Sequence, residues 1–267
     1  MRIIALLAAL TIPVPVMAAG LNGIKGQDDR VEVAAGQYPW SAIGRLNNGM
    51  GGHCSGILIG PRLVVTAAHC LWNKKTRRPM PAESLRFVAG YDRGQYLAFT
   101  KVVETTIAPA WRFDAPYGAE LAATDWALLQ LAEPLGEQVG WVAVGTPPSA
   151  ADWLVTVGYG QDKAHIPAAH LGCRLTGKLS SGVLTHDCDA VHGDSGAPVL
   201  VWRAGQPTLA AIHVATFGFG SGKYLGGAVA VSTFAAEARR MGAMEPGQPG
   251  RLSAPLDPAL AVTAPKP

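Results

Sequence analysis

Residues 192–198 read HGDSGAP, and an apolar segment, PVLVW, begins at the last of them and runs to residue 202. Glycine accepts backbone conformations with positive φ, and serine commonly bonds the backbone of its own turn. Taken alone, the stretch therefore predicts a tight turn that leads into a β-strand. Ser195 becomes a candidate nucleophile only if the rest of the chain supplies a base, an acid that orients the base, and a scaffold that brings them together.

The composition is that of a globular chain. Of 267 residues, 49% are hydrophobic and 32 are glycine, which suits one or two domains with a large core and many turns. The formal net charge of +3 is too small to indicate a nucleic-acid partner, and none is expected. The densest basic run, KKTRR at residues 74–78, lies among turn residues, and we interpret it as a solvated loop.

The two ends of the chain differ from its body. Residues 1–19 begin with one arginine before an apolar stretch and close on small residues, which is typical of a secretory signal peptide. Pro13 and Pro15 interrupt the apolar stretch, which argues against a membrane anchor. Residues 20–27 form a glycine-rich lead-in or propeptide, and residues 245–267 are predicted to be a disordered tail. We therefore expect a secreted or periplasmic protein without a membrane span.

Between these ends, short apolar segments alternate with Gly, Pro, Asn and Asp. Many short strands with almost no internal helix favour an all-β sandwich or barrel. Residues 234–244 are the one convincing helical segment, with Ser232 or Thr233 as a candidate N-cap. The predicted strands form a first unit (residues 41–46, 56–59, 63–66, 85–89, 101–107 and 126–131) and a second (residues 153–157, 172–175, 181–184, 198–202, 208–214 and 228–231).

Two further motifs also place a polar residue beside an apolar segment. LVVTAAHC at residues 63–70 carries His69, and TDWALLQL at residues 124–131 carries Asp125. A serine hydroxyl is a poor nucleophile until a neutral imidazole accepts its proton, and a carboxylate must fix the tautomer of that imidazole. His69, Asp125 and Ser195 are therefore candidates for one catalytic group held at strand ends.

The three motifs, in this order, resemble those of the trypsin/chymotrypsin-like serine proteases. The resemblance covers residues 28–244. It implies two antiparallel Greek-key β-barrels, residues 28–140 and residues 141–244, with the active site between them and the C-terminal helix in the second unit. It also implies an exported serine endopeptidase that cleaves protein or peptide substrates through an acyl-enzyme, uses no cofactor or metal, and acts as a monomer.

Within this resemblance each catalytic residue has a role. His69 is the general base, Asp125 orients it, and Ser195 is the nucleophile, while the backbone N–H groups of Gly193 and Ser195 form the oxyanion hole. Ala197 departs from the family pattern, which usually has glycine there. The alternatives are a catalytically inactive binding or adhesion protein on the same fold, and an esterase or acyltransferase. The latter more often carries G-x-S-x-G between a strand and a helix, which this chain lacks.

The even number of cysteines suits export, and neither pair has the close spacing of a zinc site. The family resemblance implies one disulfide between Cys54 and Cys70 and another between Cys173 and Cys188.

The lead-in IKGQDDR at residues 24–30 resembles the start of bacterial secreted proteases related to the glutamyl endopeptidases. Gly23 is neither Arg nor Lys, so the sequence shows no trypsin-type activation site before Ile24. In the animal enzymes the residue equivalent to Asp194 pairs with a freed amino terminus. Here the partner of Asp194 is expected to be another group.

The residues that would select the side chain before the scissile bond support different substrate preferences. Asp189 has the offset from Ser195 at which trypsin-like enzymes carry the carboxylate that binds Arg or Lys. Ile212-His213 resembles the pair with which the glutamyl endopeptidases help to hold an acidic side chain, and Thr216 lies further along the same segment. In a third interpretation Asp189 bonds loop backbone and His213 packs within its strand. From the sequence we expect a slight preference for Arg or Lys over Glu.

Overall fold

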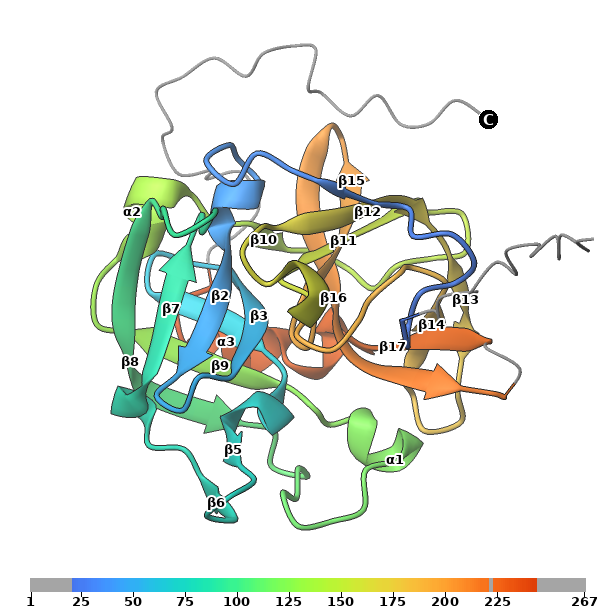
Figure 1. Ribbon diagram of the computed structural model, residues 1–267, viewed down its shortest axis with the longest axis horizontal. Coiled ribbons are helices and arrows are strands. Elements are labelled where there is room, and N and C mark those ends of the chain that lie inside the picture. Colours follow the sequence, from blue (N-terminus) through green and yellow to red (C-terminus); the bar gives the residue numbers. More distant parts are fainter. Residues whose placement is uncertain (1–20, 221–222, 244–267) are drawn as a thin grey trace, which may run out of the picture.

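The computed structural model describes residues 21–220 and 223–243, so the predicted signal peptide and the predicted tail lie outside the described residues. Within these residues the regular secondary structure is mostly strand, arranged in two main sheets that lie side by side (Figure 1). No helix among them is long and apolar enough to cross a membrane. The all-β class expected from the sequence is confirmed.

Six antiparallel strands close into the first barrel. In order around the barrel they are β2 (Ile43–Asn48), β3 (His53–Leu58), β4 (Leu63–Thr66), β9 (Ala127–Leu131), β8 (Ala98–Ile107) and β7 (Leu85–Ala89). The register places Thr66, at the end of β4, opposite Ala127 at the start of β9. Antiparallel neighbours bring the end of one strand beside the start of the other, so the segments after β4 and before β9 meet at one rim.

The second sheet has nine strands among the described residues. Its path is β1 (Arg30–Glu32), β12 (Ala168–Cys173), β11 (Leu154–Gly158), β15 (Pro198–Arg203), β16 (Gln206–Gly218), β17 (Tyr224–Ala230), β14 (Leu184–His186) and β13 (Leu175–Lys178), with β10 (Ala143–Val144) parallel to β16. Only Arg174 separates β12 from β13, yet the two pair with strands far apart on this path, so the sheet wraps around itself. β1 pairs with β12, which places it in this sheet although it precedes the first barrel in sequence.

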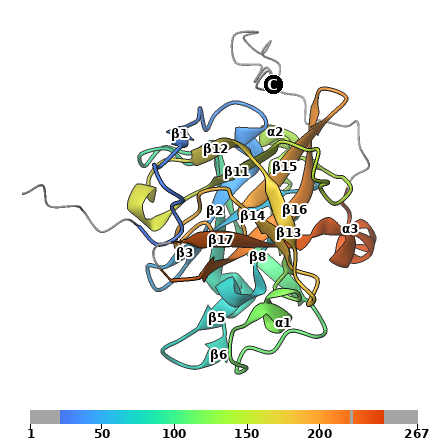
Figure 2. The ribbon, with the colours of Figure 1, turned by 90° about the vertical axis from the view of Figure 1, so that its right-hand side faces the viewer.

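The helical segments are short. They are α1 (Ala119–Ala122), α2 (Leu135–Val139) and α3 (Ala235–Arg240), with 3₁₀ turns η1 (Trp40–Ala42), η2 (Ala68–Leu71), η3 (Ala82–Ser84), η4 (Gln161–Lys163) and η5 (Val231–Thr233). A separate hairpin of β5 (Trp72–Asn73) and β6 (Arg78–Pro79) projects beside α1 and carries the basic run in its turn (Figures 1 and 2).

The C-terminal helix differs in detail from the sequence prediction. Ser232 and Thr233 lie in η5, and the N-cap residue of α3 is Phe234, which makes no side-chain capping bond. Gly242 has a φ of 102°, and the helix ends just before it. The buried Phe234 ring lies 6.0 Å from the Trp126 ring, so the segment that follows the second sheet packs back against the first barrel.

Phe87 on β7 fills the interior of the first barrel and is fully buried. Gly44 on β2 leaves room for it, because a Cβ there would lie 2.4 Å from the Phe87 ring. The missing side chain of this glycine therefore allows a large aromatic group at the centre of the barrel.

Replacing Phe87 with alanine should lower the free energy of unfolding by about 3–5 kcal/mol, because a buried aromatic side chain leaves a cavity. Phe99, which pairs with Val88 across β7 and β8 and is 54% exposed, is the matched control. Replacing Phe99 with alanine should lower the free energy of unfolding by less than about 1 kcal/mol. Urea unfolding followed by tryptophan fluorescence measures both variants, and equal losses would show that Phe87 does not hold this core together.

Candidate active site

His69 and Asp125 meet at the rim between β4 and β9. His69 lies on η2, directly after β4, and Asp125 precedes β9. The His69 Nδ1 atom lies 2.6 Å from Asp125 Oδ2, and the His69 backbone N–H donates to Asp125 Oδ1 at 2.9 Å. A carboxylate only accepts hydrogen bonds, so the imidazole hydrogen is on Nδ1 and Nε2 is left as an acceptor. This is the tautomer that a general base requires.

A tyrosine outside the sequence motifs completes the surroundings of Asp125. The Tyr117 Oη atom lies 2.6 Å from Asp125 Oδ2 and 2.8 Å from the Val214 carbonyl oxygen. Tyr117 is 47% exposed, but its hydroxyl is turned inward, and burial together with the charge of Asp125 raises its pKa. The hydroxyl therefore keeps its single hydrogen and donates it to one of these oxygens. Sequence analysis missed Tyr117 because it stands in an irregular segment eight residues before Asp125.

Ser195 lies in a tight turn between two glycines with positive φ, 101° at Gly193 and 81° at Gly196. The turn docks on the first barrel. The Ser55 N–H donates to the Ser195 carbonyl oxygen at 2.9 Å, and the Ser55 hydroxyl donates to the Gly193 carbonyl oxygen at 3.1 Å. A Cβ at Gly196 would lie 2.9 Å from the Ala67 nitrogen, so glycine allows this close approach. The Ser195 turn thus rests against the segment that leads into η2.

Two backbone N–H groups in this turn have no acceptor among the described residues. The Gln161 N–H donates to the His192 carbonyl oxygen at 2.6 Å. Because a trans peptide holds its C=O and N–H on opposite sides, the Gly193 N–H points away from Gln161. Neither the Gly193 nor the Ser195 N–H donates a hydrogen bond to any described residue. Both can therefore donate to an anionic oxygen.

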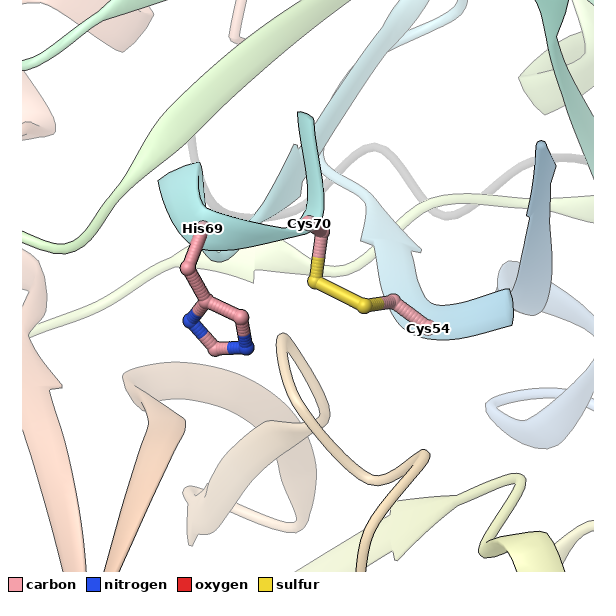
Figure 3. Close-up of side chains that lie close together, drawn as sticks. All are labelled: Cys54, His69 and Cys70. Atoms are coloured by element: carbon pink, nitrogen blue, oxygen red, sulfur yellow. A yellow bond between two sulfur atoms is a disulfide. The ribbon is translucent and has the colours of Figure 1, made fainter. Parts of the chain in front are cut away.

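Two disulfides brace the loops around the site. Cys54 on β3 bonds Cys70 on η2, next to His69, with the Cα atoms 6.2 Å apart (Figure 3). Cys173, at the end of β12, bonds Cys188 with the Cα atoms 4.9 Å apart. The Cys54–Cys70 disulfide links residues 16 positions apart, and in the chain-entropy model a loop of this size adds roughly 3 kcal/mol to the free energy of unfolding. The sulfur atoms of Cys54 and Cys70 lie near the His69 ring, but the disulfide consumes both thiolates, so these three side chains are not a metal site.

Asp189 is buried and faces the amino-terminal segment. Its Oδ1 atom accepts from the Lys25 N–H at 2.8 Å and its Oδ2 atom from the Asp29 N–H at 3.1 Å. Burial alone would raise the pKa of Asp189, but the contact with His170 and the two backbone donors outweigh burial and lower it. Each oxygen thus accepts from one backbone donor and the side chain is 1% exposed, which are the surroundings of the third interpretation.

His213 on β16 is buried, and its neighbours fix its tautomer. The Cys188 N–H donates to His186 Nδ1 at 3.2 Å, so the His186 hydrogen is on Nε2, which lies 3.1 Å from His213 Nδ1. His213 Nδ1 is therefore the acceptor, and the His213 hydrogen is on Nε2. Burial and the nearby charge of Lys25 lower the pKa of His213 to about 3. At neutral pH His213 is an uncharged donor.

Lys25 carries its ammonium group into the same neighbourhood. Its Nζ atom donates to the carbonyl oxygens of Gly23 and Cys188, and burial lowers its pKa to about 8. Gly23 packs so closely that an added Cβ would overlap the Ala190 carbonyl group and would lie 3.5 Å from the Thr216 Cγ2 atom. The lead-in is therefore built into the fold beside Ala190 and Thr216.

Two grooves meet at His69. One has a volume of about 460 Å³ and is lined in part by Thr216. The other, of about 330 Å³, contains Gly193 and two lysines of the basic run, Lys74 and Lys75. The first groove is aromatic, with Trp72, Trp111, Phe113 and Tyr117 on its walls.

Comparison with known proteins agrees with the class that this fold and site define. The family model described as Trypsin matches residues 28–236, so the chain belongs to the trypsin family. It is similar to the glutamyl endopeptidase of Bacillus licheniformis, with 30% identity over 185 residues that cover 67% of this chain and 55% of the relative. It is also similar to coagulation factor XII of Cavia porcellus, with 28% identity over 204 residues that cover 63% of this chain and 33% of the relative. The chain thus spans about half the length of the first relative and a third of the second.

A solved structure of a Glu endopeptidase in complex with MPD has the same fold, with a TM-score of 0.67 at 20% identity, over 83% of this chain and 100% of that chain. The family resemblance drawn from the sequence motifs is therefore confirmed. The structural match covers 83% of this chain, far more than the three motifs alone.

Replacing Tyr117 with phenylalanine should lower kcat by roughly 10- to 100-fold while KM changes little, because one hydrogen bond to a buried carboxylate is worth about 1.5–3 kcal/mol. Tyr96→Phe is the control, since Tyr96 is 51% exposed and its ring contacts only Phe99 among the described aromatic residues. Steady-state hydrolysis of a peptide ester measures both variants. A Tyr117→Phe enzyme with wild-type kcat would mean that the hydroxyl bonds only the Val214 carbonyl group.

Proposed function

We propose that this protein is an exported serine endopeptidase that hydrolyses peptide bonds through an acyl-enzyme on Ser195. The observation that carries the proposal is the His69–Asp125 pair, whose geometry leaves Nε2 of the imidazole as a proton acceptor. Export is supported by the character of residues 1–19 and by the two disulfides, which persist in oxidising compartments.

The first half of the proposed reaction acylates the enzyme. The Ser195 Oγ atom attacks the substrate carbonyl carbon while its proton passes to His69 Nε2, and Asp125 stabilises the imidazolium that results. The carbonyl oxygen becomes an oxyanion that accepts hydrogen bonds from the Gly193 and Ser195 N–H groups. The C–N bond then breaks, and the amine leaves with the proton from His69.

The second half repeats these steps with water. His69 takes a proton from the water molecule as its oxygen attacks the ester carbon of the acylated Ser195. The same two N–H groups stabilise the second oxyanion. When the ester C–O bond breaks, the acid product is released and Ser195 Oγ recovers the proton from His69.

A fluorophosphonate probe should label this protein at Ser195 alone. Ser195→Ala should abolish the labelling and lower the rate of proteolysis by about 10⁶-fold. Ser149→Ala is the control, because Ser149 is exposed and bonds only Asp152 among the described side chains. Peptide mapping by mass spectrometry identifies the labelled serine. If wild-type protein with both disulfides formed is neither labelled nor active, the alternative of an inactive binding protein on this fold is the better account.

We further infer that the preferred residue before the scissile bond is acidic. Asp189 offers little to a basic side chain, since its own side chain is 1% exposed and each of its oxygens already accepts from a backbone N–H. His213 offers a neutral Nε2–H, and the Lys25 ammonium lies close enough to lower the pKa of His213. The similarity to a relative named glutamyl endopeptidase supports the same substrate class.

Matched peptides with Glu or Gln before the scissile bond test this preference. The Glu:Gln ratio of kcat/KM should fall above about pH 8, because the buried Lys25 ammonium, with its lowered pKa, loses its charge there. Lys25→Met should reduce the ratio by roughly 10-fold at pH 7, as expected for loss of a charged hydrogen bond. The exposed Lys101→Met is the control. An unchanged ratio in Lys25→Met, or a preference for Arg over both peptides, would contradict the inference.

A further inference from the structure

The guanidinium of Arg30 is buried beside the nucleophile turn. The Arg30 side chain is only 2% exposed. Its Nε and Nη2 atoms donate to the two Asp28 oxygens, each at 2.9 Å, and its Nη1 and Nη2 atoms donate to the two Asp162 oxygens at 3.2 and 2.6 Å. Paired planar contacts of this kind fix both the position and the orientation of a guanidinium, which stays charged at any physiological pH.

Asp194 is the buried carboxylate next to this group. It is 3% exposed, and its Oδ2 atom accepts from the Val191 N–H at 2.8 Å. Arg30 Nη1 lies 3.8 Å from the same oxygen and is the one cation within ion-pair distance of Asp194 in the described part of the chain. Burial raises the pKa of Asp194 to about 7, while the Val191 N–H and the Arg30 charge act in the opposite direction. Arg30 thus favours the ionised carboxylate.

Arg30 also reaches the turn by a second route. Asp162, held by Arg30, lies on η4 next to Gln161, whose N–H donates to the His192 carbonyl oxygen at 2.6 Å. That bond sets the orientation of the peptide that carries the Gly193 N–H. One guanidinium therefore supports both sides of the turn that presents the free N–H groups.

We propose that Arg30 is a positioning residue that holds residues 191–195 in the conformation that binds the oxyanion, in place of a freed amino terminus. The inference rests on the proposed function of Ser195 and extends it to the amino-terminal segment. Its consequence is that turnover does not depend on the residue at which the chain begins upstream of Gly23.

The direct test is Arg30→Gln in the full chain. kcat for a peptide ester should fall by roughly 100-fold with a much smaller change in KM, because a displaced oxyanion donor acts on the transition state. The fluorophosphonate labelling rate should fall in parallel. Arg93→Gln is the matched control, since Arg93 forms a similar two-oxygen pair with Glu32 on the surface. Active wild-type enzyme with Arg30→Gln retaining kcat within about threefold would overturn this inference alone, whereas wild-type enzyme without Ser195 labelling would overturn the proposed function.

A double-mutant cycle separates positioning from general stabilisation. Because Asp194 is one of the two routes, Arg30→Gln should lower kcat by a smaller factor in an Asp194→Asn background than in the wild-type enzyme. Effects that multiply would contradict the proposal. Should Arg30→Gln fail to fold, the same cycle is run with Arg30→Lys, which keeps the charge.

Wild-type enzyme carrying three extra residues before residue 20 completes the test. The proposal predicts that this extended enzyme has the same kcat as the enzyme without the extra residues. An extended enzyme that stays inactive until it is trimmed would refute the proposal.

Discussion

Ser55, a fully buried residue on β3, joins the two sheets at the place where the proposed catalytic groups lie. Its N–H bonds the Ser195 carbonyl oxygen, its hydroxyl donates to the Gly193 carbonyl oxygen, and the same hydroxyl accepts from the Tyr159 N–H at the end of β11. His69 belongs to the first barrel and Ser195 to the second sheet, so neither unit holds the whole of the proposed site. The contacts of Ser55 hold the Ser195 turn against the first barrel, whose rim carries His69, and a buried hydroxyl with all its partners present specifies one arrangement.

Three buried aspartates illustrate how the partners of a carboxylate decide its role. A buried charge is tolerated only when it is paired or hydrogen-bonded. Asp125 is bonded by the imidazole that it orients, Asp189 by backbone N–H groups, and Asp194 by a backbone N–H with Arg30 nearby. Two of these three sets include partners from residues 25–30. The amino-terminal segment is therefore part of the site, and the lead-in is as much a component of the fold as the strands are.

Features that depend on residues close together in the chain could be predicted from the sequence. Short strands and three motifs at strand ends were sufficient for the all-β class and the family, and the family resemblance implied that His69 and Asp125 act together. Residues whose partners lie far along the chain could not be found in this way. Ser55 bonds a residue 138 positions away, Arg30 one 132 positions away, and the Lys25 N–H reaches Asp189 across 164 positions. The offset of Asp189 from Ser195 suggested a basic substrate, but only the packing of a distant segment shows that its oxygens are occupied.

The central claim is that Ser195 and the two N–H groups of its turn act on one carbonyl group. A crystal structure of the protein after reaction with a peptidyl phosphonate tests it most directly. The account predicts phosphorus bonded to Ser195 Oγ, with one phosphoryl oxygen about 2.7–3.1 Å from both the Gly193 and Ser195 nitrogens. A phosphonate on another residue, or a phosphoryl oxygen directed into solvent with neither N–H bonded, would contradict it.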